Sequence, residues 1–257
     1  MIDRRRALIG GSVNCVPILP DDVTRYPMIF NGRYAVKNKS VNNYGYYNPN
    51  TGEYVSVYDL IGVEIKSVDY LENTGTEYIT TNFIPNSDTR VVALASYTGY
   101  KSTAKLFGSR YTLSREAFGT GPGGADTIRF CFNYGYSGNI FSDIPFDYEP
   151  HIFDINKNIF YIDNALAGVA PVDSFTTPGK MEIFATLATG TVSHANYIAN
   201  AKIWYVKIFD NNEIICHFIP VKIGSTGYML DTVEWKLYAN EGTGSFICGA
   251  EKPWRWN

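Results

Sequence analysis

Apolar and polar residues alternate with a period of two along most of the chain after residue 62. The clearest case is TIRFCFNY (127–134), where the apolar residues Ile128, Phe130, Phe132 and Tyr134 share one parity and Thr127, Arg129, Cys131 and Asn133 share the other. Successive side chains of a strand point to opposite faces. The segment is therefore predicted to be a strand with one face in the core and the other facing water or a second layer.

Other segments extend this pattern. RVVALASY (90–97) is apolar on both faces, as expected for a strand in the middle of a sandwich, and MEIFATLA (181–188) repeats the alternation. NIFYIDNALAGV (158–169) is predicted to form two short strands joined at Asp163–Asn164, because these residues tolerate the positive φ of a two-residue hairpin turn. AKIWYVKIFDNNEIICHFIPV (201–221) is predicted to be a longer hairpin that turns at residues 210–212.

The stretch VDYLENTGTEYITTNFIPN (68–86) is predicted to begin the sandwich. The core parity changes between Ile65 and Val68, so we expect a bulge or bend at Lys66–Ser67. Gly75–Thr76 should turn the chain, and residues 78–83 should form the next strand, which ends before Pro85 because proline cannot donate to a ladder.

These elements predict an all-β fold with few helices. No stretch keeps a 3.6-residue period, and roughly a dozen short strands indicate two packed antiparallel sheets. The composition agrees, because aromatic residues make up 15% of the 257 residues, with 20 Tyr against 4 Met. The net charge of −3 gives no reason to expect nucleic acid or an anionic membrane as a partner.

Residues 1–62 differ in character from residues 63–257. The first part carries seven Lys or Arg and five Asp or Glu, hence +2, and the second carries fifteen and twenty, hence −5. Within the first part, VPILPDDV (16–23) should run extended between its prolines. YGYYNPNTGEYVSVYDL (44–60) should form a hairpin with residues 48–52 at its tip. We therefore expect an extended arm and a small hairpin ahead of one large domain.

Cysteine usage and the first residues indicate no special processing. Cys15, Cys131, Cys216 and Cys248 stand far apart without metal-ligand spacing, so we interpret them as reduced and mostly buried, although a disulfide pair stays open if the protein is exported. The start MIDRRRALIGGSVNC has too short an apolar part for a signal peptide, and no run is long enough to span a bilayer. We expect an uncleaved arm and no membrane insertion.

Several motifs together resemble a known family. They are DYLENTGTEYITTNFIPNSDTRV (69–91), LFGSR (106–110), FYIDNALAG (160–168), AKIWYVKIFDNNEIICHFIPV (201–221) and LYANEGTGSF (237–246). In this order they resemble the concanavalin A-like, laminin G-like jelly-roll module, most of all the version found in tail, fibre and head-surface proteins of tailed phages. The resemblance covers about residues 63–250. It implies a two-sheet jelly roll, and it implies no particular activity, since such modules include lectins, hydrolases and purely structural domains.

The residues argue against an enzyme. Hydrolases of this fold that cut β-glucans use E-x-D-x-x-E on one strand, and this string is absent. Asp147 and Glu149 share a face in FDYEPHIFD (146–154), but we interpret them as a solvated strand end. The scattered histidines His151, His194 and His217 are expected to be structural, and the glycine-rich FGTGPGGAD (118–126) to be a flexible loop. We expect no catalytic residue and no cofactor, and we name no metal site.

A glycan-binding role rests on four tyrosines. Lectins stack exposed rings on sugar faces and bond sugar hydroxyls with Asp or Asn, at a sandwich rim or across its face. Candidates are Tyr97 and Tyr100 in SYTGYKS (96–102), and Tyr134 and Tyr136 in NYGYSGN (133–139). The alternative is that these residues only fill turns and sheet edges.

The third hypothesis is attachment to a particle. Arg4, Arg5 and Arg6 form a basic cluster suited to an acidic surface, and Tyr46 and Tyr47 are candidate interface residues in a segment too aromatic for a disordered one. The alternative for residues 1–12 is a solvated, disordered end. We expect a noncatalytic protein of the virion surface that binds other capsid or tail proteins through residues 1–62, forms a homo-oligomer (a trimer by analogy) and contacts host-surface glycan. A secreted or cell-surface bacterial lectin is the alternative.

Overall fold

A computed structural model describes five parts of the chain with their side chains and four further strands by backbone alone. The parts are residues 65–112, 115–123, 128–186, 197–234 and 236–252, with side chains at 111–117 excepted; the strands lie between residues 23 and 56. The chain divides into two compact units, Met1–Ile65 and Lys66–Asn257, which are considered separately. The sequence analysis placed this division at residue 62.

The N-terminal unit contains a four-stranded antiparallel meander, in the order β1 (Val23–Phe30), β2 (Arg33–Asn38), β3 (Asn43–Asn48) and β4 (Glu53–Ser56). The predicted hairpin is confirmed as β3–β4, in which Asn48 pairs with Glu53. The strands β1 and β2 were not predicted. Their signal in the sequence is Asn31–Gly32 between the paired residues Phe30 and Arg33, since Asn-Gly is a preferred two-residue hairpin connection.

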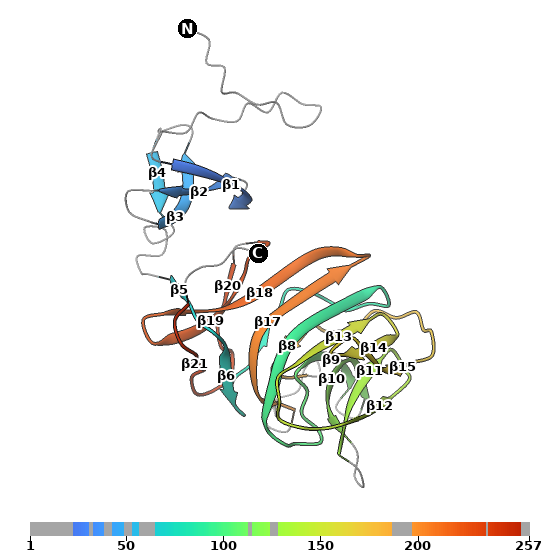
Figure 1. The fold of residues 1–257 in the computed structure, drawn as a ribbon. Helices are drawn as coiled ribbons and strands as arrows, with labels where there is room; N and C mark the ends of the chain where they lie inside the picture. Colours follow the sequence, from blue (N-terminus) through green and yellow to red (C-terminus); the bar gives the residue numbers. More distant parts are fainter. Residues whose placement is uncertain are drawn as a thin grey trace, which may run out of the picture. The chain divides into compact units, whose positions relative to one another are not determined.

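The larger unit is all-β, with no helix among its described residues, and its two antiparallel sheets pack face to face as a jelly-roll sandwich (Figure 1). The six-stranded sheet has the order β12-β11-β10-β9-β16-β7. Its strands are β7 (Ile79–Thr80), β9 (Phe107–Thr112), β10 (Arg115–Gly123), β11 (Arg129–Tyr134), β12 (Asn139–Pro145) and β16 (Glu182–Ile183). The predicted fold class is confirmed.

The 11-stranded sheet, called the large sheet below, has the path β15-β14-β13-β8-β17-β18-β19-β20; β6 pairs with β17 and β21, and β5 pairs with β18. Its strands are β5 (Ile65–Ser67), β6 (Leu71–Thr74), β8 (Thr89–Gly99), β13 (His151–Asn156), β14 (Ile159–Ile162), β15 (Ala165–Val169), β17 (Asn200–Asp210), β18 (Glu213–Ile223), β19 (Thr226–Asp231), β20 (Lys236–Tyr238) and β21 (Ile247–Cys248). The long strands β8, β17 and β18 form its curved centre (Figure 1). RVVALASY lies in this centre, as predicted.

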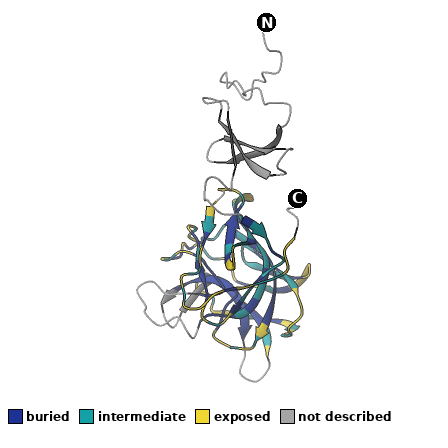
Figure 2. Cartoon of the chain, turned by 90° about the vertical axis from the view of Figure 1, so that its left-hand side faces the viewer, coloured by how far each residue is buried: buried dark blue, intermediate teal, exposed yellow. Residues whose placement is uncertain are grey.

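The core between the sheets is built largely from phenylalanine rings. Phe130 on β11 meets Phe153 on β13 edge to face at 5.3 Å, and Phe132 lies 5.0 Å from Phe160 on β14. All four rings have 0% exposure, and burying one such side chain contributes about 2–3 kcal/mol. Figure 2 shows the buried residues concentrated along the strands and the exposed ones mostly in loops and at strand ends.

The predicted turns are confirmed where the sequence provides residues that tolerate positive φ. Asp163 and Asn164 have φ of 51° and 66° between β14 and β15, and Asn211 and Asn212 have φ of 48° and 67° between β17 and β18. Gly75 turns the chain after β6 with φ of 106°. These two-residue turns fix the hairpin registers, as right-handed strand twist requires.

Three strand predictions were wrong in extent. Within the described part of MEIFATLA, residues 181–186, only Glu182–Ile183 is strand, because Phe184 adopts a φ of 69° and turns the chain while its ring stays buried. Of the predicted strand 78–83, only Ile79–Thr80 pairs. In TIRFCFNY, Ile128 is 46% exposed and precedes the strand.

The glycine-rich segment predicted to be a loop is largely a strand. β10 runs to Gly123 in the interior of the six-stranded sheet, paired with β9 and β11. A Cβ at Gly121 would lie 2.3 Å from the carbonyl oxygen of Ala104, and one at Gly123 would lie 2.8 Å from Cys131 Sγ. Glycine is needed here for close approach of neighbouring chain segments, a role that composition alone does not distinguish from loop flexibility.

Candidate binding face on the large sheet

The outward face of the large sheet can be assigned from β8. Val91, Ala93 and Ala95 point into the core with 0% exposure, whereas the alternate residues Val92 and Leu94 are half-buried on the other side. Cross-strand pairing then carries this assignment from β8 to its neighbours. Residues paired with Val92 or Leu94 lie on the same outward face, because paired residues share a face.

Apolar side chains form a continuous row across this face. Leu94 pairs with Ile152 on β13 and with Tyr205 on β17. Since Val206 pairs with Phe218, the residue before it, Tyr205, faces Ile219 on β18. Ile219 pairs with Leu230, which pairs with Leu237. We call this set the apolar row: Ile152, Leu94, Tyr205, Ile219, Leu230 and Leu237. A sheet face that only meets water carries polar residues instead.

A bulge in β17 brings Tyr205 into this row. The register of β17 against β8 shifts between Ile203 and Tyr205, which leaves Trp204 as an extra residue. One extra residue reverses the parity of the strand. Trp204 lies 5.5 Å from the ring of Tyr70, and Lys202 Nζ lies 4.8 Å above the same ring.

A second row beside the apolar row carries polar groups. It runs from Tyr161 through Asp154 and Val92 to Lys207 and His217, each paired with the next across the sheet. Asp154 and Lys207 in this row are charged and His217 carries an imidazole, and all three lie next to the apolar row. We call this second row the polar row.

Asp154 is held by an arginine from the neighbouring strand. Arg90 donates from Nε to Asp154 Oδ1 at 2.9 Å and from Nη2 to Oδ2 at 2.6 Å. The hydrogen bond to Asp154 raises the pKa of Arg90, although burial opposes it. The guanidinium also lies 5.4 Å from the ring of Phe209. Both charges are therefore oriented by each other and by an aromatic surface.

Lys207 and His217 lie next to each other in the polar row, on β17 and β18. Lys207 Nζ lies 5.5 Å from the ring of Tyr205. Burial, and then the charge of Lys207, lower the pKa of His217 to about 4. The imidazole is therefore neutral at physiological pH, with one N–H donor and one acceptor nitrogen. Burial, and then the charge of Asp154, raise the pKa of Tyr205, which keeps its phenol protonated.

Two of the predicted glycan-binding tyrosines lie in the interior. Tyr97 and Tyr134 are each 2% exposed, so neither presents a ring face to a ligand from outside. The ring of Tyr97 packs against Phe130 and Phe153. Tyr97 follows Ser96 on β8, and both are buried at this end of the strand.

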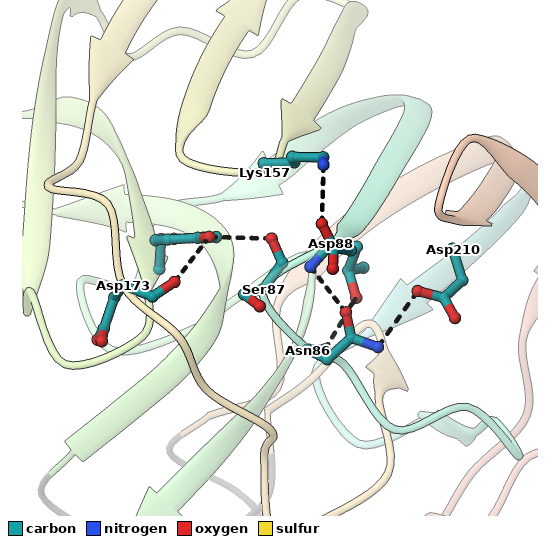
Figure 3. A network of polar contacts seen from close by, with 8 residues as sticks. Asn86, Ser87, Asp88, Lys157, Asp173 and Asp210 are labelled. Carbon is teal, nitrogen blue, oxygen red and sulfur yellow. Dashed lines mark hydrogen bonds and ion pairs between the residues drawn. The ribbon is translucent and has the colours of Figure 1, made fainter.

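Tyr134 bonds to Ser87 and Asp173 in a network of polar contacts at the loop before β8. Figure 3 shows this network, with Ser87 and Asp173 labelled. The Tyr134 hydroxyl lies 2.9 Å from the carbonyl oxygen of Ser87 and 3.2 Å from that of Asp173, and its one hydrogen can serve either. In the same network, Lys157 Nζ donates to Asp88 Oδ1 at 2.7 Å, and Asn86 Nδ2 donates to Asp210 Oδ1 at 3.2 Å. These contacts give Tyr134 a structural role.

The other two tyrosines are at the surface in different places. Tyr100, 37% exposed, meets Phe146 edge to face at 5.6 Å, and Phe146 meets Tyr148, which is 56% exposed, at 5.3 Å. Tyr136 is 52% exposed in the turn between β11 and β12, where its backbone N–H donates to Asp173 Oδ2. The rim thus carries an aromatic cluster in which Tyr100 and Tyr148 are exposed and Phe146 is half-buried.

Asp147 of FDYEPHIFD, which precedes β13, and Asp163 together hold His151. Asp147 Oδ1 accepts the backbone N–H of Glu149 at 2.9 Å and lies 2.8 Å from His151 Nε2, while His151 Nδ1 lies 2.5 Å from Asp163 Oδ2. Burial lowers the pKa of His151, but its bonds to the two carboxylates outweigh burial and raise that pKa on balance. These contacts hold the imidazole between two carboxylates, and its structural role stays a prediction.

Several predicted residues lie outside the described parts of the chain. These are Arg4, Arg5, Arg6, Cys15, His194 and residues 16–22 of the predicted extended segment 16–23, and for Tyr46 and Tyr47 the backbone of β3 alone is described. Cys131 and Cys216 are buried and Cys248 is half-buried, all as free thiols.

Among the residues with described side chains, no group of three or more acidic, His or Cys residues is arranged to hold a metal ion. No helix in the described parts is long and apolar enough to cross a membrane.

The outward face was not predicted from the sequence. Its signal was present in AKIWYVKIFDNN, where Tyr205, Lys207 and Phe209 share the parity opposite to the core residues Val206 and Ile208.

Among models of known families and among curated proteins, none matches this chain.

Proposed function

We propose that the protein is a noncatalytic surface protein of a tailed-phage particle. In this proposal, residues 1–62 attach it to capsid or tail proteins, and the jelly-roll unit is displayed outward, where it adheres to glycan on the host surface. The motifs from residue 69 to residue 246 support the family assignment by resemblance. The division into two compact units supports separate attachment and display.

The observation that carries the adhesive role is the apolar row. Apolar side chains from six neighbouring strands lie on the face of the large sheet that points away from the core. Five of these side chains are half-buried and Leu230 is 2% exposed, so the row is a partly covered apolar strip. Apolar side chains on a sheet face turned away from the core suit contact with a ligand or a partner. The polar row beside it adds donors and acceptors at fixed positions, and sugars present both apolar ring faces and hydroxyls.

Adhesion is tested with a charge placed in the apolar row. Leu94→Lys in the full chain should lower binding to host cells or to their isolated polysaccharide by about tenfold or more, because the ammonium must lose water to bind. Val172→Lys is the matched control, since Val172 is 86% exposed outside this face. Equal binding by both variants, with unchanged circular dichroism, would show that the outward face of the large sheet takes no part in adhesion.

Attachment is tested separately. A chain that lacks residues 1–62 should still bind the polysaccharide and should be missing from purified particles made in its presence. Incorporation of the truncated chain at the level of the full chain would contradict the attachment role. Analytical ultracentrifugation of the full chain tests the homo-oligomer, for which a trimer is expected by analogy.

A secreted or cell-surface bacterial lectin is the second candidate. The aromatic cluster Tyr100, Phe146 and Tyr148 favours it, because adjacent surface rings at a sandwich rim suit stacking on sugars. Tyr148→Ala should then abolish binding on a glycan array while Leu94→Lys leaves it intact. This is the opposite of the result expected from adhesion through the large sheet.

A further inference from the structure

The cations on the outward face of the large sheet differ in their partners. Arg90 is paired with Asp154, and Lys202 Nζ lies 3.6 Å from Glu72 Oε2. Lys207 has the Tyr205 ring as its neighbour, and within the described residues no carboxylate lies at ion-pair distance from it. Its nearest acidic neighbour in the polar row, Asp154, is separated from it by Val92 and already engaged by Arg90.

The groups around Lys207 suit one kind of ligand. His217 lies directly across from it on β18 and carries no charge at physiological pH. The other charged group near this imidazole is Asp231, whose carboxylate accepts the backbone N–H of His217 at 3.0 Å. The Tyr205 ring belongs to the apolar row. One cation, one neutral donor and acceptor, and one ring therefore meet on β17 and β18.

We propose that Lys207, His217 and Tyr205 form a binding site for an acidic sugar of the uronic acid type. The sugar carboxylate pairs with Lys207 Nζ, a neighbouring hydroxyl bonds to the imidazole of His217, and the pyranose ring packs on Tyr205. This inference rests on the proposed adhesive function and names its ligand class.

A ring-borne carboxylate fits better than a phosphate polymer. A uronic carboxylate carries one negative charge, which matches the single ammonium of Lys207, and its own ring supplies the apolar face for Tyr205. A glycerol phosphate chain has no ring to stack.

The test compares a matched pair of ligands on the full chain by calorimetry. Oligogalacturonate should bind about tenfold or more tightly than its methyl ester, which keeps the rings and removes the charge. Lys207→Gln should abolish this difference. Lys222→Gln should preserve it, because Lys222 is paired with Glu251 at 2.8 Å outside the site.

The imidazole of His217 gives a second, local readout by NMR. Oligogalacturonate should raise the pKa of His217, because the bound carboxylate offsets the charge of Lys207, and the methyl ester should not. Lys207→Gln alone should raise that pKa in the free protein, after which the acid adds nothing. A purely structural Lys207 would leave the response to ligand unchanged.

The outcomes distinguish failure of the acidic-sugar site from failure of the proposed adhesive function. Equal affinity for acid and ester, or tighter binding of polyglycerol phosphate than of oligogalacturonate, overturns the acidic-sugar site and leaves adhesion standing. Loss of acid preference in Lys222→Gln as well as in Lys207→Gln also overturns it. No binding of host polysaccharide or of either oligosaccharide overturns the proposed function together with this inference.

Discussion

Arg90 and Asp154 face each other across β8 and β13 with two parallel hydrogen bonds of 2.9 and 2.6 Å. Asp154→Asn keeps the shape and removes the charge, so it should lower the free energy of unfolding by about 1 kcal/mol, less in high salt. Urea denaturation at two salt concentrations measures this effect. Asp143→Asn is the control, because Asp143 is fully exposed at 3.5 Å from Arg129 and should change nothing. Equal effects would show that the paired geometry contributes little.

Gly121 allows Lys105 to cross β10. A Cβ at this position would lie 2.7 Å from Lys105 Cδ, and Lys105 Nζ reaches Cys131 Sγ at 3.2 Å. Gly121→Ala should lower the free energy of unfolding by about 2 kcal/mol or more, since the contacting atoms include backbone. Gly138→Ala, with φ of 76° and no atom within 4 Å, should cost only the backbone strain, about 1 kcal/mol. Thermal and urea unfolding of both variants measure the difference, and a Gly121→Ala loss no larger than that of Gly138→Ala would contradict close approach as the reason for glycine.

The elements that could be predicted from the sequence are those set by residues close together in the chain. Asp163–Asn164 and Asn211–Asn212 tolerate positive φ, so their hairpins and registers followed from short-range signals. The alternation of TIRFCFNY and the apolar run of RVVALASY, together with the other short strands, were enough for the fold class. The same kind of signal at Asn31–Gly32 was overlooked.

What the sequence did not reveal depends on contacts between distant segments. In the sequence alone, a glycine such as Gly121 indicates flexibility. Its role in close packing becomes visible only when Ala104 is known to lie against it. Phe184 continues an apolar alternation, yet its positive φ ends the strand because Leu106 and Ala199 bond its backbone. The candidate binding face needs the pairing of Leu94 with both Ile152 and Tyr205, and no local pattern specifies which strands become neighbours.

His151 should make stability depend on pH through its two carboxylate partners. Because its folded pKa is raised, its contribution is fully present below the unfolded pKa of about 6.5 and is lost as pH rises through the folded value. The stability difference between the wild type and His151→Gln should therefore shrink as pH rises above about 6.5. Using the difference removes the contribution of His217, whose lowered pKa has the opposite sign. A difference that stays constant with pH would contradict the bonds to Asp147 and Asp163.

Glu182 should act in the same direction as His151, because its folded pKa is also raised. Burial, and to a lesser extent the charge of Glu241, raise the pKa of Glu182 to about 8, so the folded protein holds a proton that the unfolded chain releases near pH 4.5. Thr80 Oγ1 lies 2.7 Å from Glu241 Oε2 and 3.3 Å from Glu182 Oε2. A hydroxyl has one hydrogen to donate, so a neutral Glu182 beside an ionised Glu241 satisfies both contacts.

The wild type should therefore lose stability as pH rises from about 4.5 to about 8, because the native state binds more protons than the unfolded state. Glu182→Gln keeps the size and cannot ionise, so it should be more stable than the wild type by at least about 1 kcal/mol at about pH 9, and close to it at about pH 5. Urea denaturation across this range measures the curve. Glu241→Gln serves as the control: it removes the neighbouring charge, so it should lower the pKa of Glu182 and weaken the pH dependence without abolishing it. A Glu182→Gln curve parallel to that of the wild type would mean that the carboxyl is ionised in the folded protein and that burial does not keep it neutral.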